Sequence, residues 1–233
     1  MRISKFIAHS GYCSRRDAEK LIYEKKITIN DLVCKTPAIN VTEKDIIKIN
    51  NKKINLLKKK RIWSFYKPVG FITTKNDPQG RKTVFDIIPK NLSGLITIGR
   101  LDINSEGLLL LTNNGDLARY FELPKNKIKR SYRVRIRGSV DKKNLSYLKK
   151  GLVIDGFKYK GIIAVLNKQM GANAWITMTL TEGKNREIRK ICRHFGWQVN
   201  KLIREGYGDF SLGMLKPGNI REETNHNYHN VLI

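Results

Sequence analysis

Hydrophobic residues near the start of the chain recur at the spacing of amphipathic helices. They predict one helix over residues 3–9 and a second that Ser14 caps, with Asp17 in a capping-box position. The apolar positions lie three and four residues apart: Ile3, Phe6 and Ile7 in the first helix, Ala18, Leu21 and Ile22 in the second. Two strand-like segments, 27–29 and 45–49, follow between turns that contain Asn and Asp. Residues 1–60 are therefore expected to form a small module of two helices and a sheet, near the lower size limit for independent folding.

Beyond residue 60 the pattern changes to the alternation of apolar and polar residues that is typical of β-strands. The strands expected from it are 62–66, 129–137, 152–154, 162–166, 175–180, 199–203 and 210–212, and the helices are 116–121, 141–150 and one that ends at Gly196. The chain is therefore predicted to be an α+β protein with a second domain over residues 61–221. Residues 222–233 are polar and are expected to form a short tail.

The charge of the chain points to a class of partner. Its 46 Lys and Arg residues against 20 Asp and Glu residues give a formal net charge of +26, which predicts a polyanionic partner. Nucleic acid is the leading candidate, and a membrane surface is the rival. The longest clean apolar run, Leu108–Leu111, is far too short to span a membrane, and the first residues lack the features of a secretory signal.

Cysteine and histidine usage adds two expectations. Cys13, Cys34 and Cys192 have no CxxC spacing, which indicates the reduced thiols of a cytoplasmic protein. The histidines do not form a metal-ligand pattern with them, and no glycine motif for a nucleotide phosphate is present. Neither a metal ion nor a nucleotide cofactor is therefore expected.

One segment, Gly99–Gly107, carries the best candidate chemistry. Arg100 and Asp102 are two residues apart, so both side chains point to the same side of an extended segment. Leu101 and Ile103 favour burial on the other side, and they hold Asp102 where a charge is costly unless it is paired or used. On spacing alone, an aspartate that makes turn hydrogen bonds at the end of a strand is the simpler interpretation.

Basic residues in the first sixty positions have two interpretations each. Arg15 and Arg16 lie in the first turn of the second expected helix, where the helix dipole disfavours positive charge. They either donate to phosphates or are a solvated pair. The run Lys58–Arg61 is either an exposed linker or a linker that also contacts nucleic acid.

The strand over 129–137 alternates sharply. Arg133, Arg135 and Arg137 share one face and form either a solvated surface or a surface that faces nucleic acid. Tyr132 is on the opposite face, where its ring serves as core or as a stacking platform. The helix before Gly196 carries a similar basic stripe, of a kind that is usually solvated: Arg186, Arg189, Lys190 and Arg193.

Residues 2–55 resemble S4-type RNA-binding domains. The pattern that carries the resemblance is Ser14-Arg15-Arg16-x-Ala18-Glu19-x-Leu21-Ile22 followed by Ile27-Thr28-Ile29-Asn30. Domains of this family present the basic start of their second helix to structured RNA. The resemblance therefore implies that Arg15, Arg16 and Lys20 contact RNA.

Four motifs in residues 61–221 together resemble the RsuA/RluB branch of the pseudouridine synthases. They are Lys67-Pro68-x-Gly70; Gly99-Arg100-Leu101-Asp102 with Ser105–Asn113; Tyr132-Arg133-Val134; and Glu182-Gly183-Lys184-x-Arg186-x-Ile188-Arg189. The resemblance implies a mixed, mostly antiparallel sheet flanked by helices, and the cofactor-free isomerisation of a uridine in ribosomal RNA. The segment over residues 77–86 is most similar to members that act on the large subunit, which here implies a structured stem-loop of 23S RNA.

The same resemblance implies roles for single residues. Asp102 either attacks the ribose as a nucleophile or removes a ribose proton to give a glycal, and Arg189 pairs with it. Tyr132 stacks on the target base and assists proton transfer. Arg100 fills or braces the gap left by the flipped nucleotide, and Lys67 closes the pocket or meets the RNA backbone. Further expected RNA contacts are Lys184 and Arg186.

Alternatives stay open at this point. One alternative is a related synthase that acts on the small subunit or on another large-subunit site. Another is a non-catalytic RNA-binding or ribosome-assembly protein that uses the same surfaces. A DNA-binding or membrane-surface protein explains the charge alone. Asp102 separates enzyme from binder, because a binder has no need of a half-buried carboxylate with a matching arginine. A monomer is expected, since no heptad repeat or large apolar stripe is visible.

Overall fold

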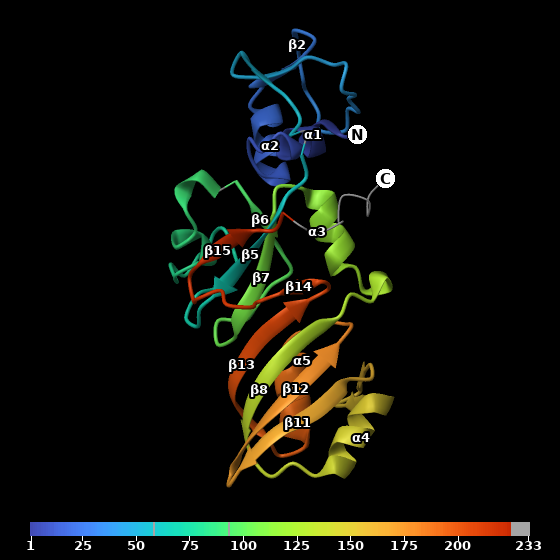
Figure 1. Ribbon diagram of the computed structural model, residues 1–233. Coiled ribbons are helices and arrows are strands. Elements are labelled where there is room, and N and C mark those ends of the chain that lie inside the picture. The colour runs from blue at the N-terminus through green and yellow to red at the C-terminus, as the bar shows by residue number, and fades with distance from the viewer. Residues whose placement is uncertain (58, 93, 225–233) are drawn as a thin grey trace.

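The computed structural model describes residues 1–224 except 58 and 93, and it shows a small N-terminal module at one end of a long, twisted sheet (Figure 1). The module contains α1 (Ile3–His9), α2 (Arg15–Tyr23), β1 (Ile27–Ile29), β2 (Leu32–Val33), β3 (Ile47–Ile49) and β4 (Lys52–Ile54). Its strands form an antiparallel sheet in the order β2-β1-β3-β4. The expected strand over 45–49 begins only at Ile47, because the carboxylate of Asp45 accepts hydrogen bonds from Thr42 and Asn30 in a turn.

Buried apolar side chains from both helices and the sheet hold the module together. They are Ile3, Phe6, Ile7, Ala18, Ile22, Ile27, Cys34, Val41, Ile47 and Ile49. The predicted helix cap is confirmed: Ser14 Oγ accepts a hydrogen bond from the Asp17 N–H at 3.2 Å and donates to the Asp17 carboxylate at 2.6 Å. A cap of this kind stabilises a helix by about 1 kcal/mol.

One nine-stranded sheet forms the framework of the remaining chain. Its main order is β11-β12-β8-β13-β7-β5-β15, and β14 pairs with β13 while β6 pairs with β7. The strands are β5 (Ile62–Lys67), β6 (Ile96–Ile98), β7 (Glu106–Thr112), β8 (Arg130–Arg137), β11 (Ile163–Met170), β12 (Asn173–Leu180), β13 (Gln198–Tyr207), β14 (Phe210–Ser211) and β15 (Ile220–Glu222). Only β13 and β7 pair in parallel within it, so the expected α+β fold with a mostly antiparallel sheet is confirmed.

Helices and a hairpin flank this sheet. They are α3 (Gly115–Glu122), α4 (Lys142–Lys150), α5 (Glu187–His194) and the hairpin of β9 (Leu152–Ile154) and β10 (Phe157–Tyr159), with 3-10 turns at Val84–Asp86, Lys90–Leu92 and Pro124–Asn126. Helix α3 begins one residue earlier than expected, because Asn114 Oδ1 caps it by accepting from the N–H groups of Asp116 and Leu117, both at 3.0 Å. Helix α5 lies behind β8, β12 and β13 in Figure 1.

The central strand β7 is buried on both faces. Leu109 and Leu111 pack into the cluster that α4 and α5 cover, whereas Leu108 and Leu110 pack into a second cluster under α3 and β14. An uninterrupted apolar run is the pattern expected of a strand with no solvated face. The Gly99–Gly107 segment therefore leads directly into the most deeply buried strand of the sheet.

Direct contacts attach the N-terminal module to the sheet domain. Lys5 of α1 forms an ion pair with Asp116 at the start of α3, at 2.8 Å. His9 of the same helix also reaches Asp116, with its Nε2 3.9 Å from the carboxylate. The burial of His9 lowers its pKa, although Asp116 opposes this shift.

The expected linker over Lys58–Arg61 is held more firmly than predicted. Arg61 forms an ion pair with Glu222, and its guanidinium lies 4.7 Å from the centre of the Trp63 ring. Lys58 lies outside the described residues. Arg61 therefore keeps a side chain that is 42% exposed but is anchored to the sheet domain by Glu222.

The end of the sheet domain also differs from the prediction. Strand β15 pairs with β5 and includes Glu222, and the N–H of Glu223 donates to the carbonyl oxygen of Ile62 at 2.9 Å. The polar tail predicted from residue 222 therefore begins later, and its residues 225–233 lie outside the described chain. Within the described residues, no helix is both long and apolar enough to cross a membrane.

Candidate active site

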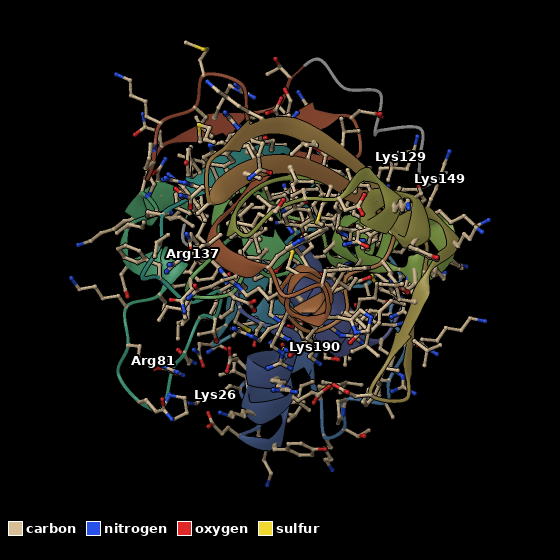
Figure 2. All side chains as sticks on the ribbon, turned by 90° about the horizontal axis from the view of Figure 1, so that it is seen from below. Lys26, Arg81, Lys129, Arg137, Lys149 and Lys190 are labelled. Carbon is tan, nitrogen blue, oxygen red and sulfur yellow. The ribbon has the colours of Figure 1, made fainter. Side chains whose placement is uncertain are left out.

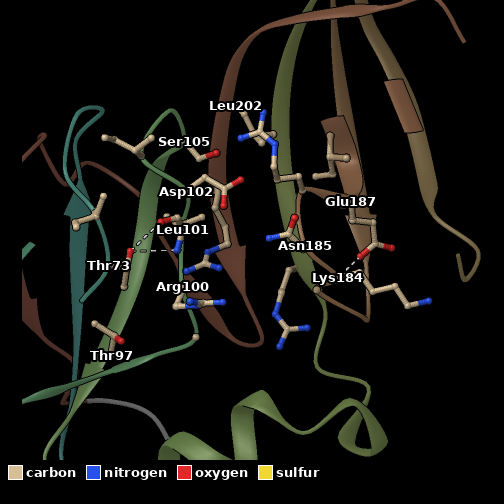
Figure 3. A pocket seen from close by; sticks show the side chains of 18 of the residues that line it. Thr73, Thr97, Arg100, Leu101, Asp102, Ser105, Lys184, Asn185, Glu187 and Leu202 are labelled. Carbon is tan, nitrogen blue, oxygen red and sulfur yellow. Dashed lines mark hydrogen bonds between the residues drawn. The ribbon is translucent and has the colours of Figure 1, made fainter. Parts of the chain in front are cut away.

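A cavity of about 940 Å³ opens beside Asp102, between the loop before β7 and the start of α5. Its wall is built from the segments 72–77, 99–105 and 183–189 and from side chains of β8 and β13. Figure 3 shows Arg100 and Asp102 projecting into this cavity and Thr73 bonded to the backbone of Leu101, whose side chain packs in the buried cluster. Of the residues expected at the site, the cavity gathers Arg100, Asp102, Tyr132, Lys184, Arg186 and Arg189.

Hydrogen bonds from neighbouring loops fix the Asp102 segment. Thr73 Oγ1 donates to the carbonyl oxygen of Leu101 at 2.9 Å and accepts from its N–H at 3.2 Å. The N–H of Ser105 donates to the carbonyl oxygen of Asp102 at 3.0 Å and closes a turn. Gly99 adopts a left-handed φ of +68°, and its N–H donates to the carboxylate of Glu122 at 2.7 Å. The half-buried Asp102 side chain therefore starts from a fixed backbone.

A row of residues across neighbouring strands forms the floor of the site. Lys67 on β5, Gly107 on β7, Arg204 on β13 and Tyr132 on β8 are successive partners in the register of the sheet. Gly107 has a φ of +103°, and a Cβ atom there would lie 2.3 Å from the carbonyl oxygen of Arg204. Only glycine therefore allows β7 and β13 to approach so closely at this point.

Lys67 is fully buried in this floor, which corrects the expectation that it meets the RNA backbone. Its Nζ donates to the carbonyl oxygens of Ser105 at 2.7 Å and Pro68 at 2.9 Å. Burial lowers the pKa of Lys67 to about 8, and the negative charges of Asp102 and Glu106 limit that fall. Lys67 therefore supports the Asp102 loop from below.

Arg189 lies beside the Asp102 loop but differs from its expected role. Its Nη2 donates to the carbonyl oxygen of Asn104 at 2.7 Å, and its Nη1 donates to that of Val199 at 3.4 Å. Among the described contacts it forms no ion pair with Asp102, although burial lowers and the charge of Asp102 raises the pKa of Arg189. Instead of pairing directly with Asp102, Arg189 therefore holds two backbone carbonyl oxygens and attracts the carboxylate over a longer distance.

Tyr132 lies where its ring is part of the core and is also available as a stacking platform at the cavity. The residue is 8% exposed, packs in the cluster with Val134 and Ile136, and lines the cavity. Core packing holds the ring in place, while one side of it faces the space beside Asp102.

Two buried arginines in the cavity wall were not expected. Arg130 Nη2 donates to the Tyr207 hydroxyl at 2.8 Å, and Arg204 Nε donates to the carbonyl oxygen of Leu108 at 2.7 Å. Their guanidinium groups lie 4.6 Å and 5.0 Å from the centre of the Tyr207 ring. Arg130 has the parity of Tyr132 in an alternating strand, so the sequence contained a signal for its burial. Arg204 had no such signal.

The loop before α5 brings further charges to the cavity. Lys184 forms an ion pair with Glu182 at 3.3 Å and lies 5.2 Å from the centre of the Tyr159 ring. Arg186 caps α5 from a left-handed conformation with a φ of +51°. The carboxylate of Glu187 accepts from the Lys184 N–H at 2.9 Å, and burial together with Glu182 raises the pKa of Glu187 to about 7.

The predicted contacts in the N-terminal module lie outside the cavity. Arg15, Arg16 and Lys20 are exposed on α2. The same helix approaches the cavity wall, because the charge of Asp17 acts on Lys75, whose pKa burial lowers. Segment 72–77 of the cavity wall is therefore close to α2.

A carboxylate in a cationic cavity, joined to a basic helical module, defines an enzyme that acts on a polyanion. The chain belongs to the RNA pseudouridylate synthase family, whose model matches residues 61–194, and the model of the S4 domain matches residues 1–47. The resemblance to the RsuA/RluB kind of pseudouridine synthase is confirmed, and with it an isomerase that acts on RNA.

Relatives and solved structures agree with this assignment. An RNA pseudouridine synthase of Rickettsia bellii is 50% identical over 96% of this chain and 96% of its own. Ribosomal large subunit pseudouridine synthase B of Buchnera aphidicola is 40% identical over 95% of this chain and 87% of its own. A crystal structure of a pseudouridylate synthase is similar with a TM-score of 0.67 and 25% identity, over 96% of both chains.

Proposed function

We propose that this pseudouridine synthase isomerises one uridine in a stem-loop of 23S ribosomal RNA and that Asp102 is the reacting carboxylate. The large subunit is proposed because relatives named ribosomal large subunit pseudouridine synthase B are 36–40% identical over most of the chain. A monomer acting in the cytoplasm is part of the same proposal.

One observation carries the assignment of Asp102. Four acidic residues line the cavity: Asp77, Asp102, Glu122 and Glu187. Asp77 is bound by Arg81, Glu122 accepts from Gly99, and Glu187 accepts from Lys184. Of these four carboxylates, only that of Asp102 has no hydrogen-bond partner among the described contacts. A carboxylate held on a fixed backbone without a structural partner is available to a substrate.

The reaction needs little beyond this carboxylate. The bond between the ribose C1′ and the base N1 breaks, the base turns, and C5 bonds to C1′ while its proton is lost and N1 is protonated. Product and substrate contain the same atoms, so no net oxidant or reductant is consumed. Asp102 either bonds to C1′ in between or removes the proton from C2′ and later returns it.

Neighbouring side chains support the proposed steps. Tyr132 offers a ring for stacking on the base, at the cavity floor. Arg100 is exposed at the rim, where it can occupy the gap left by the extruded nucleotide. Lys67 and Arg189 hold the backbone of the Asp102 loop through Ser105 and Asn104.

The test combines a map with one substitution. Pseudouridines are mapped in ribosomal RNA from cells with the gene, without it, and with the Asp102→Asn variant. One 23S position should depend on the gene and be lost in the variant, while purified Asp102→Asn binds RNA within a few fold of wild type. Asp77→Asn is the matched control, since it removes a carboxylate that Arg81 already holds. A modified position in 16S RNA, or retained activity of Asp102→Asn, would contradict the proposal.

A further inference from the structure

The side of the sheet that faces away from the cavity carries a basic surface that the reaction does not use. We call it the outer basic face, and its residues are Arg133, Arg135 and Arg137 of β8, Trp175 of β12, Lys168 of β11 and Lys201 of β13. Alternate residues of a strand point to opposite faces, so this surface is opposite to Tyr132. Figure 1 shows α5 behind these strands, and Figure 2 shows the strands as an outer layer with α5 inside their curve.

The register of the sheet aligns like charges on this surface. Lys168, Trp175, Arg135 and Lys201 are successive partners across β11, β12, β8 and β13. Like charges on directly opposite residues destabilise a sheet, so the pair of Arg135 and Lys201 is unfavourable for folding. Lys201 is partly compensated by Glu106 at 3.1 Å. Arg135 and Arg137 form no ion pair with any described residue.

The centre of the surface is a stacking platform. The guanidinium of Arg133 lies 4.6 Å from the centre of the Trp175 ring. Unpaired RNA bases stack on aromatic rings and on guanidinium planes, and sheet surfaces with such groups bind single strands. Beside it, Thr177 and Asn167 present a hydroxyl and an amide that are bonded to each other at 2.9 Å. Ile163 and Val165 extend the surface with apolar groups that are 54% and 53% exposed.

We propose that the outer basic face binds a second, single-stranded segment of the substrate RNA while the target stem-loop occupies the cavity on the other side. This rests on the proposed function for the identity of the RNA. Excess positive charge matches the phosphates, and the Arg133–Trp175 platform matches unpaired bases. Because the two surfaces lie on opposite faces of β8, a short stem-loop in the cavity does not reach the outer one. The face therefore selects long RNA that wraps around the sheet.

The test uses two exposed arginines whose removal spares the core. Arg135→Gln/Arg137→Gln is compared with Lys149→Gln/Lys150→Gln, which removes the same charge from the exposed end of α4. Binding to a full-length 23S transcript and to a short stem-loop around the modified uridine is measured from about 50 to about 200 mM salt. For the transcript, the arginine variant should bind about tenfold more weakly and its salt slope should fall by about one to two. The lysine control should resemble wild type on both RNAs.

Two outcomes would overturn the proposal. Equal transcript binding by the arginine and lysine variants would show that charge alone matters, and an equal loss on the stem-loop would place the arginines in the ordinary substrate site. Arg135→Lys/Arg137→Lys keeps the charges and should recover most of the salt slope, which guards against a folding defect. Isomerisation by the wild type is scored separately, so failure of the proposed function is distinguishable from failure of this surface.

Discussion

A Cβ atom at position 107 would lie only 2.3 Å from the carbonyl oxygen of Arg204. Gly107 and Arg204 are partners in the parallel pair of β7 and β13, which joins the Asp102 loop to the floor of the site. The left-handed φ of +103° at Gly107 adds to the constraint. The pairing of β7 with β13 therefore depends on the absence of a side chain at position 107.

Gly107→Ala should destabilise the fold strongly. A methyl group at 2.3 Å from the carbonyl oxygen and 2.7 Å from the nitrogen of Arg204 forces the strands apart, and we expect a loss of about 3 kcal/mol or more in the free energy of unfolding. Urea denaturation of the purified variant measures it. Gly156→Ala is the matched control, because Gly156 also has a positive φ of +75° but nothing within 4 Å, so only about 1 kcal/mol is expected. Equal losses in both variants would contradict the packing explanation.

Arg189→Lys separates charge from bracing. Lysine keeps the positive charge near Asp102 but cannot reach the carbonyl oxygens of Asn104 and Val199 together, as the two nitrogens of Arg189 do. We expect single-turnover isomerisation to slow by about 10- to 100-fold, because a displaced loop misplaces the carboxylate. RNA affinity should stay within about threefold of wild type. Full activity of Arg189→Lys would show that the charge alone is required.

Lys67 should give the protein a distinctive alkaline profile of stability. Its pKa falls from 10.5 to about 8 on burial, so between these values the unfolded chain binds a proton that the native protein does not. The stability conferred by this group is therefore complete above pH 10.5, and it is lost as the pH falls from 10.5 to about 8. The difference in unfolding free energy between wild type and Lys67→Met should rise by up to about 3 kcal/mol over this range. Chemical denaturation at several pH values tests this, and a flat difference would contradict it.

The sequence predicted the placement of those residues whose position depends on local pattern. The placement of Asp102 at the cavity, with Leu101 buried, follows from alternation along one segment, and that of Tyr132 follows from the parity of β8. Lys67 was misplaced because lysine is rarely buried, and only the register that sets it beside Gly107 removes it from solvent. The two carbonyl oxygens that Arg189 holds belong to distant loops, which no helical spacing reveals.

Tertiary context explains the remaining differences in the fold. Strands β2 and β4 have two and three residues, too few for an alternation to appear. Arg61 was interpreted as part of a solvated run, but β15 brings Glu222 to it from the far end of the chain. Arg204 is buried through its position on β13, where an isolated arginine in the sequence carries no sign of its surroundings.

Glu187→Gln should remove a pH dependence of opposite sign. Burial and the nearby Glu182 raise the pKa of Glu187 from 4.5 to about 7, so the native protein holds a proton that the unfolded chain has released. The stability from this group is complete below pH 4.5 and is lost as the pH rises through 7. The neutral amide keeps an acceptor for the Lys184 N–H and never ionises, so the variant should gain up to about 3 kcal/mol over wild type by pH 8. Denaturation between about pH 4 and about pH 8 measures the difference, with the exposed Glu43→Gln as control. A variant that follows the wild-type profile throughout would show that Glu187 ionises freely in the folded protein.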